Sequence, residues 1–171
     1  MSTNFCSFIA IIARLFSTKF GGGALFDMGV YGISTITYIF GYPSEIYAVS
    51  NKRNKNEVDS LTTIIFKYEC GRIIKMSFSI SFDLPLFFIL LGSDISIYIS
   101  GKWWREPSLR LEMSKQTKNF EFNSFINFTA HMISHVNKCI ESGKKESDVL
   151  SFTDTLTTAK ITDEIFTKIK I

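Results

Sequence analysis

The sequence has 171 residues, which suits one domain with a substantial core, and 46% of them are hydrophobic while 20% are charged. This composition excludes an intrinsically disordered chain. The net charge of +3 is small, and the basic residues are scattered without an aromatic platform, which argues against nucleic-acid binding.

Residues 1–20 carry an apolar run that ends at Arg14. No positive charge precedes this run, as a signal peptide would require, and the run is too short to span a bilayer, so we expect no membrane association. We expect residues 1–20 to be a ragged start or an edge strand, and residues 21–171 to form the folded domain. The three cysteines include no Cys-x-x-Cys pair, which favours a reducing, cytoplasmic location over a disulfide framework.

Residues 24–40 are predicted to form a helix directly after three consecutive glycines. Apolar residues recur there near helical spacing, and Gly41 and Pro43 provide the end of the helix. Asp27 and Tyr31 are four positions apart, so their side chains should share one face. Spacing alone favours an ordinary solvated pair on an amphipathic helix, and a functional site is the alternative.

Strands are predicted after this helix, because short apolar or alternating runs are bounded by turn residues. They cover residues 44–49, 61–69, 72–82, 86–92, 95–100 and 108–113. In the third run Ile74, Met76 and Phe78 alternate with Lys75 and Ser77, which indicates a sheet with one buried and one more polar face. A tight turn at Gly71 should join the second and third strands.

Two helices are predicted to close the chain, over residues 124–143 and 151–171. The first should turn Met132, Val136 and Ile140 inward. The second opens with Ser151 and Asp154 at the spacing of a capping box. The fold class expected is α+β, with an open, mostly antiparallel sheet and helices on one face.

Two other candidate sites find little support in the sequence. The glycines at 21–23 do not complete a Gly-x-Gly-x-x-Gly fingerprint, and no strand–helix–strand unit surrounds them. His131 and His135 have a spacing that can hold zinc, but Met132 stands where a zinc protease would place its glutamate, and no third ligand is evident. We therefore expect no metal site.

The segment GGGALFDMGVY resembles the signature that opens the C-terminal domain of the glucose–fructose oxidoreductase, inositol dehydrogenase and MocA (Gfo/Idh/MocA) family. The matching residues are Gly21, Gly22, Gly23, Asp27, Gly29 and Tyr31. Later segments agree in order, so the resemblance covers about residues 14–168. The tyrosine form is similar to the branch of dimeric dihydrodiol dehydrogenase and NADP-dependent D-xylose dehydrogenase.

The resemblance implies a role for each matching side chain. Tyr31 matches the residue that transfers the hydroxyl proton while a hydride moves between substrate and nicotinamide. Asp27 matches an aspartate that faces the same cleft and orients substrate or a neighbouring group. Gly22 and Gly23 would let the loop pass close to the cofactor domain, and Trp103 and Trp104 fall in an aromatic loop near substrate, although core or interface packing is an equal alternative for them.

The resemblance also implies a cofactor, NADP or NAD, bound mainly by an N-terminal Rossmann domain that this sequence lacks. The family's Glu-Lys-Pro motif, whose lysine lowers the pKa of the phenol, is absent as well. We expect the catalytic and dimerisation domain of an NAD(P)-dependent oxidoreductase acting on a sugar or cyclic trans-diol, inactive as this chain alone. A homodimer through the open sheet face is expected, and the alternative is a non-enzymatic truncated remnant or association domain.

Overall fold

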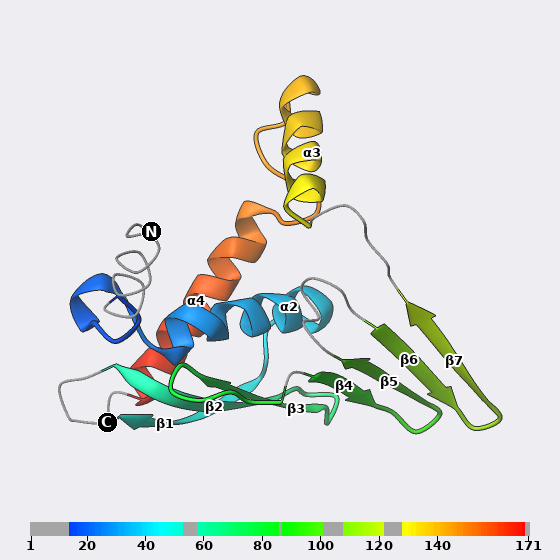
Figure 1. Cartoon of the computed structure of the whole chain (residues 1–171), viewed down its shortest axis with the longest axis horizontal. Helices are drawn as coiled ribbons and strands as arrows, with labels where there is room; N and C mark the ends of the chain where they lie inside the picture. Colours follow the sequence, from blue (N-terminus) through cyan, green and yellow to red (C-terminus); the bar gives the residue numbers. More distant parts are fainter. Residues whose placement is uncertain (1–13, 53–57, 86, 101–107, 122–127, 170–171) are drawn as a thin grey trace, which may run out of the picture. The chain divides into compact units, whose positions relative to one another are not determined.

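The computed structural model describes residues 14–52, 58–85, 87–100, 108–121 and 128–169. The chain divides into two compact units (Figure 1). The first unit consists of residues 1–84 and 148–171, and the second of residues 85–147. Both are built from helices and antiparallel strands, so the α+β class predicted from the sequence is correct. No helix of the described ranges is long and apolar enough to cross a membrane.

The helix predicted over residues 24–40 is present, and it begins with a wide turn. The π-helix η2 spans Leu25–Gly29 and continues as the α-helix α2, Val30–Phe40. Gly41 ends this helix with a φ of 74°, a value that favours glycine, and its N–H bonds to the carbonyl of Thr37.

The segment before the three glycines is helical where the structure describes it. Arg14 and Leu15 are helical, and the 3-10 helix η1 spans Thr18–Phe20. The part of residues 1–20 that is described, from residue 14 onward, therefore contains no edge strand.

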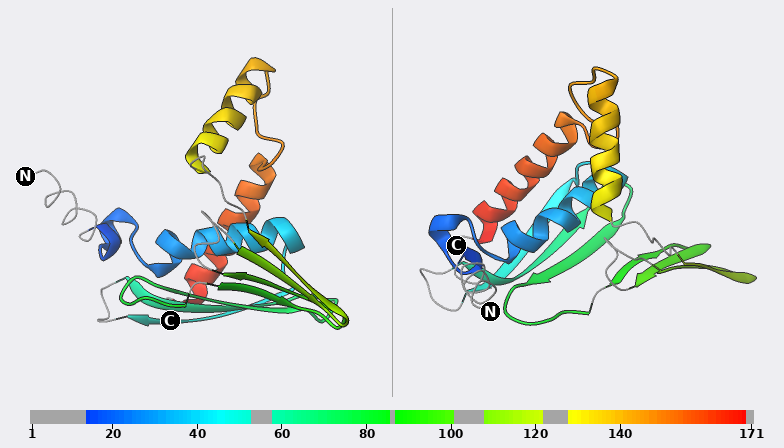
Figure 2. Two further views of the ribbon diagram at one scale, coloured as in Figure 1. Left: turned by 45° about the vertical axis from the view of Figure 1, so that its right-hand side comes forward. Right: turned by 45° about the horizontal axis from the view of Figure 1, so that its top comes forward.

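The first unit holds a three-stranded antiparallel sheet in the order β1-β2-β3. The strands are β1 Glu45–Lys52, β2 Asp59–Lys67 and β3 Ile73–Ser79. α2 and the last helix, α4 (Phe152–Ile169), lie on the same face of this sheet (Figure 2). The core between them comprises Ile33 and Ile36 of α2, Ile46, Ile64 and Phe66 of the sheet, and Ile161 and Ile165 of α4, all at most 6% exposed.

The helix can lie close to β3 because Gly32 has no side chain. A Cβ added to Gly32 would lie 2.7 Å from Cζ of Phe78, closer than carbon atoms pack. Phe78 is on the face of β3 that the alternating pattern predicted to point inward, so its ring occupies the space that a side chain at position 32 would need.

A buried carboxylate fixes the start of this helix. Asp59, the first residue of β2, is only 3% exposed. Its Oδ2 accepts hydrogen bonds from the backbone N–H of Leu25 at 2.8 Å and from the Thr62 hydroxyl at 2.5 Å. A Cβ on Gly23 would overlap Asp59 Oδ1. Asp59 therefore caps a helix that lies 34 positions earlier in the chain.

The second unit holds a four-stranded antiparallel sheet in the order β4-β5-β6-β7 and one helix, α3. Their bounds are β4 Phe87–Leu91, β5 Ile95–Ser100, β6 Ser108–Met113, β7 Gln116–Glu121 and α3 Phe128–Glu141. The strands therefore form two sheets where the sequence suggested one open sheet. β7 was not predicted, since its residues are mostly polar and all exposed.

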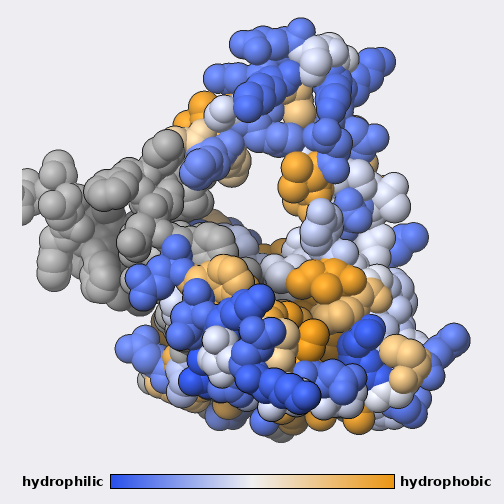
Figure 3. Space-filling model, turned by 90° about the vertical axis from the view of Figure 1, so that its right-hand side faces the viewer, coloured by the Kyte–Doolittle hydropathy of each residue, from blue (hydrophilic) through white to orange (hydrophobic). Residues whose placement is uncertain are grey.

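No side chain described within residues 85–147 is fully buried. Met132, Val136 and Ile140 of α3 are 58%, 48% and 69% exposed, so the expectation that they point inward is wrong for this structure. Hydrophobic side chains of the chain thus reach the surface among hydrophilic ones (Figure 3).

The Asp59 cap can be tested by mutation. Asp59→Ala should lower the free energy of unfolding by about 2 kcal/mol or more, because the Leu25 N–H and the Thr62 hydroxyl would lose their buried acceptor. Urea denaturation followed by circular dichroism measures this change. Asp83→Ala, at an exposed position, is the matched control and should change it by less than about 0.5 kcal/mol. Equal effects of the two variants would contradict the capping role.

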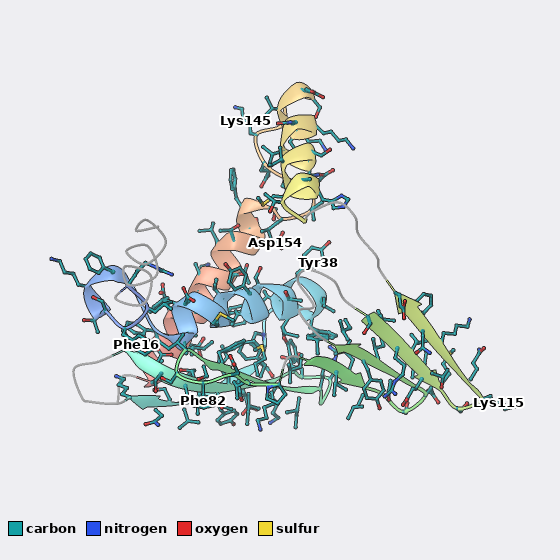
Figure 4. The ribbon with its side chains drawn as sticks, in the orientation of Figure 1. Phe16, Tyr38, Phe82, Lys115, Lys145 and Asp154 are labelled. Carbon is teal, nitrogen blue, oxygen red and sulfur yellow. The ribbon has the colours of Figure 1, made fainter. Side chains whose placement is uncertain are left out.

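The capping box at the start of α4 predicts a dependence of stability on pH. Asp154, labelled in Figure 4, accepts hydrogen bonds from the Ser151 hydroxyl at 2.6 Å and the Ser151 N–H at 2.9 Å, and these lower the pKa of its carboxyl. Their contribution is complete above the unfolded-state pKa of an aspartate, near ~4, and is lost as the pH falls through the lower folded-state pKa.

Ser151→Ala should therefore destabilise the chain by about 1 kcal/mol at neutral pH and by less in acid. Thermal unfolding between about pH 2 and pH 7 measures the difference. Thr153→Ala is the control, because Thr153 is exposed and lies two residues after Ser151. A loss for Ser151→Ala that stays constant over this range would exclude the Asp154 carboxylate as its origin.

Candidate active site

The predicted site residues Asp27 and Tyr31 lie on consecutive turns of the same helical segment. Asp27 is in the π-helical turn η2, and its side chain is 23% exposed. Tyr31 is in the first turn of α2 and is 62% exposed. The phenol is therefore at the surface and accessible to a ligand, while the wider π turn sets the position of Asp27. Such turns are frequent at functional sites.

Asp27 forms an ion pair that the sequence did not reveal. Nη2 of Arg14 lies 2.5 Å from Oδ1 of Asp27, and the arginine side chain is 51% exposed. The sequence pattern marks Arg14 only as the end of an apolar run. Since the two residues are 13 positions apart and the glycines lie between them, no periodic pattern relates them.

Gly22 and Gly23 are buried against their own chain. A Cβ on Gly22 would overlap the carbonyl oxygens of Arg14 and Leu15, and one on Gly23 would overlap Asp59. Gly23 also has a φ of 119°, which L side chains rarely adopt. These contacts alone explain why glycine occupies both positions. The approach of this loop to a cofactor domain stays a prediction.

The other residues singled out in the sequence are two tryptophans and a histidine. Trp103 and Trp104 lie outside the described residues. His135 contacts other groups of the second unit: its Nε2 is 2.8 Å from Oγ of Ser147 and 3.5 Å from Sγ of Cys139.

Asp59, which positions the helix that carries the site, was missed because a single acid at the start of a strand gives no signal in the sequence.

The model of the GFO/IDH/MocA C-terminal domain matches residues 12–100. Trans-1,2-dihydrobenzene-1,2-diol dehydrogenase of Xenopus laevis is 30% identical over 164 residues, which cover 91% of this chain and 49% of that protein. The Xenopus tropicalis protein of the same name is 27% identical over 161 residues, covering 90% of this chain and 48% of that protein.

Solved structures show the same fold. KijD10, a 3-ketoreductase from Actinomadura kijaniata in complex with NADP and TDP-benzene, has a TM-score of 0.73 at 20% identity and covers 88% of this chain and 47% of its own. Aldose-aldose oxidoreductase from Caulobacter crescentus, complexed with glycerol, has a TM-score of 0.73 at 18% identity, covering 86% and 45%. This chain therefore spans about half the length of its relatives, and it belongs to the Gfo/Idh/MocA family of oxidoreductases as a C-terminal domain.

Proposed function

We propose that this chain is the catalytic and dimerisation domain of an NAD(P)-dependent oxidoreductase that acts on a sugar or a cyclic trans-diol. The observation that carries the proposal is the exposed Tyr31 phenol, which follows an ion-paired Asp27 by one turn in the family's signature segment. The names of the relatives support the substrate classes: a dihydrobenzene diol dehydrogenase, a 3-ketoreductase and an aldose-aldose oxidoreductase.

The residues described here do not form a dinucleotide site. All strand pairs among them are antiparallel, so no parallel strand–helix–strand unit is present to bind a pyrophosphate. We infer that another part of the protein or a partner chain holds the nicotinamide, and that the loop at Gly22 and Gly23 approaches it. NADP is favoured over NAD because the KijD10 structure contains it.

The chemistry assigned to this chain is proton transfer. The hydride chemistry would be supplied by a nicotinamide held elsewhere in the protein. Tyr31, as the phenolate, takes the proton of the substrate hydroxyl at its Oη as the carbonyl forms, and returns that proton in the reverse direction. A phenol titrates near pH ~10, so it needs positive charge nearby to act as a base at neutral pH.

We infer that the charge that activates the phenol comes from another part of the protein. Arg14 is already paired with Asp27, which leaves the pair without net charge. The family resemblance assigns this role to a lysine of the cofactor domain, and that lysine's motif is absent from this sequence. The second candidate is a chain that associates with other subunits without catalysis.

Tyr31→Phe should lower kcat for diol or sugar oxidation by about 100-fold or more, because phenylalanine cannot transfer a proton. The measurement is NADPH formation by a protein that carries both this chain and a cofactor-binding half. Tyr38→Phe is the matched control, since Tyr38 lies on the same helix, is 60% exposed and points to solvent (Figure 4). A Tyr31 variant with unchanged turnover would exclude the proton-transfer role.

The two candidate functions differ in whether a supplied cofactor-binding half restores turnover. Fluorescence titration should detect no NADPH binding to these 171 residues alone under either proposal. Turnover that is restored when a cofactor-binding half is supplied supports the enzyme, whereas self-association without turnover supports the association domain.

The outer face of the three-stranded sheet is the proposed dimer interface. Tyr47, Val49, Ile65 and Ile73 are 55%, 66%, 37% and 67% exposed there, and α2 and α4, the α-helices described in the first unit, both lie on the opposite face (Figure 2). The Lys67 ammonium lies 2.5 Å from Glu45, and its hydrogen bond lowers the pKa of that carboxyl. This face therefore combines exposed apolar side chains with Lys75, which lies opposite Ile65, and with the Glu45–Lys67 pair, a mixed composition that protein interfaces also have.

Val49→Asp should convert a dimer into a monomer, because it would place two unpaired carboxylates in the apolar interface. Size-exclusion chromatography with light scattering measures the mass. Phe20→Asp replaces an apolar residue of similar exposure, 62%, outside the sheet and should leave the mass unchanged. A wild-type chain that is monomeric at micromolar concentration would contradict the interface.

A further inference from the structure

We propose that Arg14 is a positioning residue of this site, holding the Asp27 carboxylate in one orientation toward the substrate. The proposal rests on the proposed function of Tyr31 and Asp27. Its starting point is the ion pair between Arg14 Nη2 and Asp27 Oδ1, at 2.5 Å.

The backbone around Arg14 is fixed by the glycine loop. The N–H of Ser17 bonds to the Arg14 carbonyl at 3.1 Å, the N–H of Gly22 to the Ser17 carbonyl at 3.0 Å, and the N–H of Gly23 to the Leu15 carbonyl at 2.9 Å. A side chain on Gly22 would overlap the carbonyls of Arg14 and Leu15. The glycines therefore allow residues 14–17 to lie against the start of the helix.

Asp27 is fixed by the same loop. Its N–H bonds to the Gly23 carbonyl at 3.0 Å, and the Gly23 N–H bonds to the carbonyl of Leu15, the residue next to Arg14. Exposed ion pairs usually contribute little, because ordering two long side chains offsets their attraction. Here the backbones of both residues are already ordered, and the Asp27 side chain is largely buried. Both features reduce the entropy lost on forming the pair and favour a single orientation of the Asp27 carboxylate.

The pair leaves one carboxylate oxygen for a ligand. Arg14 donates to Oδ1, and no described residue donates a hydrogen bond to Oδ2. Oδ2 can therefore accept a hydrogen bond from a hydroxyl of a sugar or diol. With its charge balanced by the guanidinium, Asp27 serves as an acceptor that orients substrate, and Tyr31 is left as the group that moves the proton.

Kinetics of a double-mutant cycle test this role. In a protein that carries a cofactor-binding half, Arg14→Gln should lower kcat/KM by about 10- to 100-fold, the scale of a misplaced orienting group. In an Asp27→Asn background the same change should cost almost nothing further, because the effect of Arg14 acts through Asp27. Arg14→Lys should recover part of the loss. Arg110→Gln removes another half-exposed guanidinium, from the pair with Glu112, and should leave kcat/KM unchanged.

A measurement without catalysis gives a second test on this chain alone. Nitrogen-15 NMR should resolve slowly exchanging Nη hydrogens of Arg14 in the wild type and lose them in Asp27→Asn. Arg14 signals that do not depend on Asp27, additive losses in the cycle, or full activity of Arg14→Gln beside an impaired Tyr31→Phe would each overturn the proposal. If Tyr31→Phe also keeps full turnover, it is the proposed function that fails, and the NMR result then reports only on the ion pair.

Discussion

The hydrogen bond from the Leu25 N–H to the buried Asp59 carboxylate is the contact on which the arrangement of this domain depends. A helix start leaves several N–H groups without acceptors and carries a partial positive charge, so a carboxylate there satisfies both the hydrogen bond and the dipole. Because Asp59 belongs to β2, the cap also attaches the helix to the sheet. It is the reason that Gly23 has no room for a side chain. The positions of Asp27 and Tyr31 follow, since both lie within two turns of this attachment.

The parts of the fold that depend on local patterns were predictable. The helix over residues 24–40, its end at Gly41, the hairpin at Gly71 and the capping box at Ser151 all follow from residue spacing and turn chemistry. The division into two sheets and the strand β7 did not follow. β7 has no alternation because both its faces are exposed. The break between β3 and β4, which follow one another in the chain but belong to different sheets, leaves no mark on a periodic pattern.

The candidate site shows the same limit. Asp27 and Tyr31 could be proposed because one family signature contains both. Arg14 and Asp59 could not, since the first acts across a loop of irregular backbone and the second acts from another strand. The π turn is also invisible in the sequence, because its residues have the composition of an ordinary helix. Contacts that link separate segments therefore position the site, while local sequence supplies the groups that do its chemistry.

The polar strand β7 affects how copies of this chain can associate. It is the last strand of its sheet, and an outer strand presents unpaired backbone groups to any neighbouring chain. Lys118 and Glu121 lie along it, and Lys115 is at the turn that leads into it (Figure 4). Pairing of a second strand with β7 would require desolvation of these charges. This edge strand thus resists the edge-to-edge strand pairing from which fibrils grow, even though the other strands of the sheet carry apolar residues.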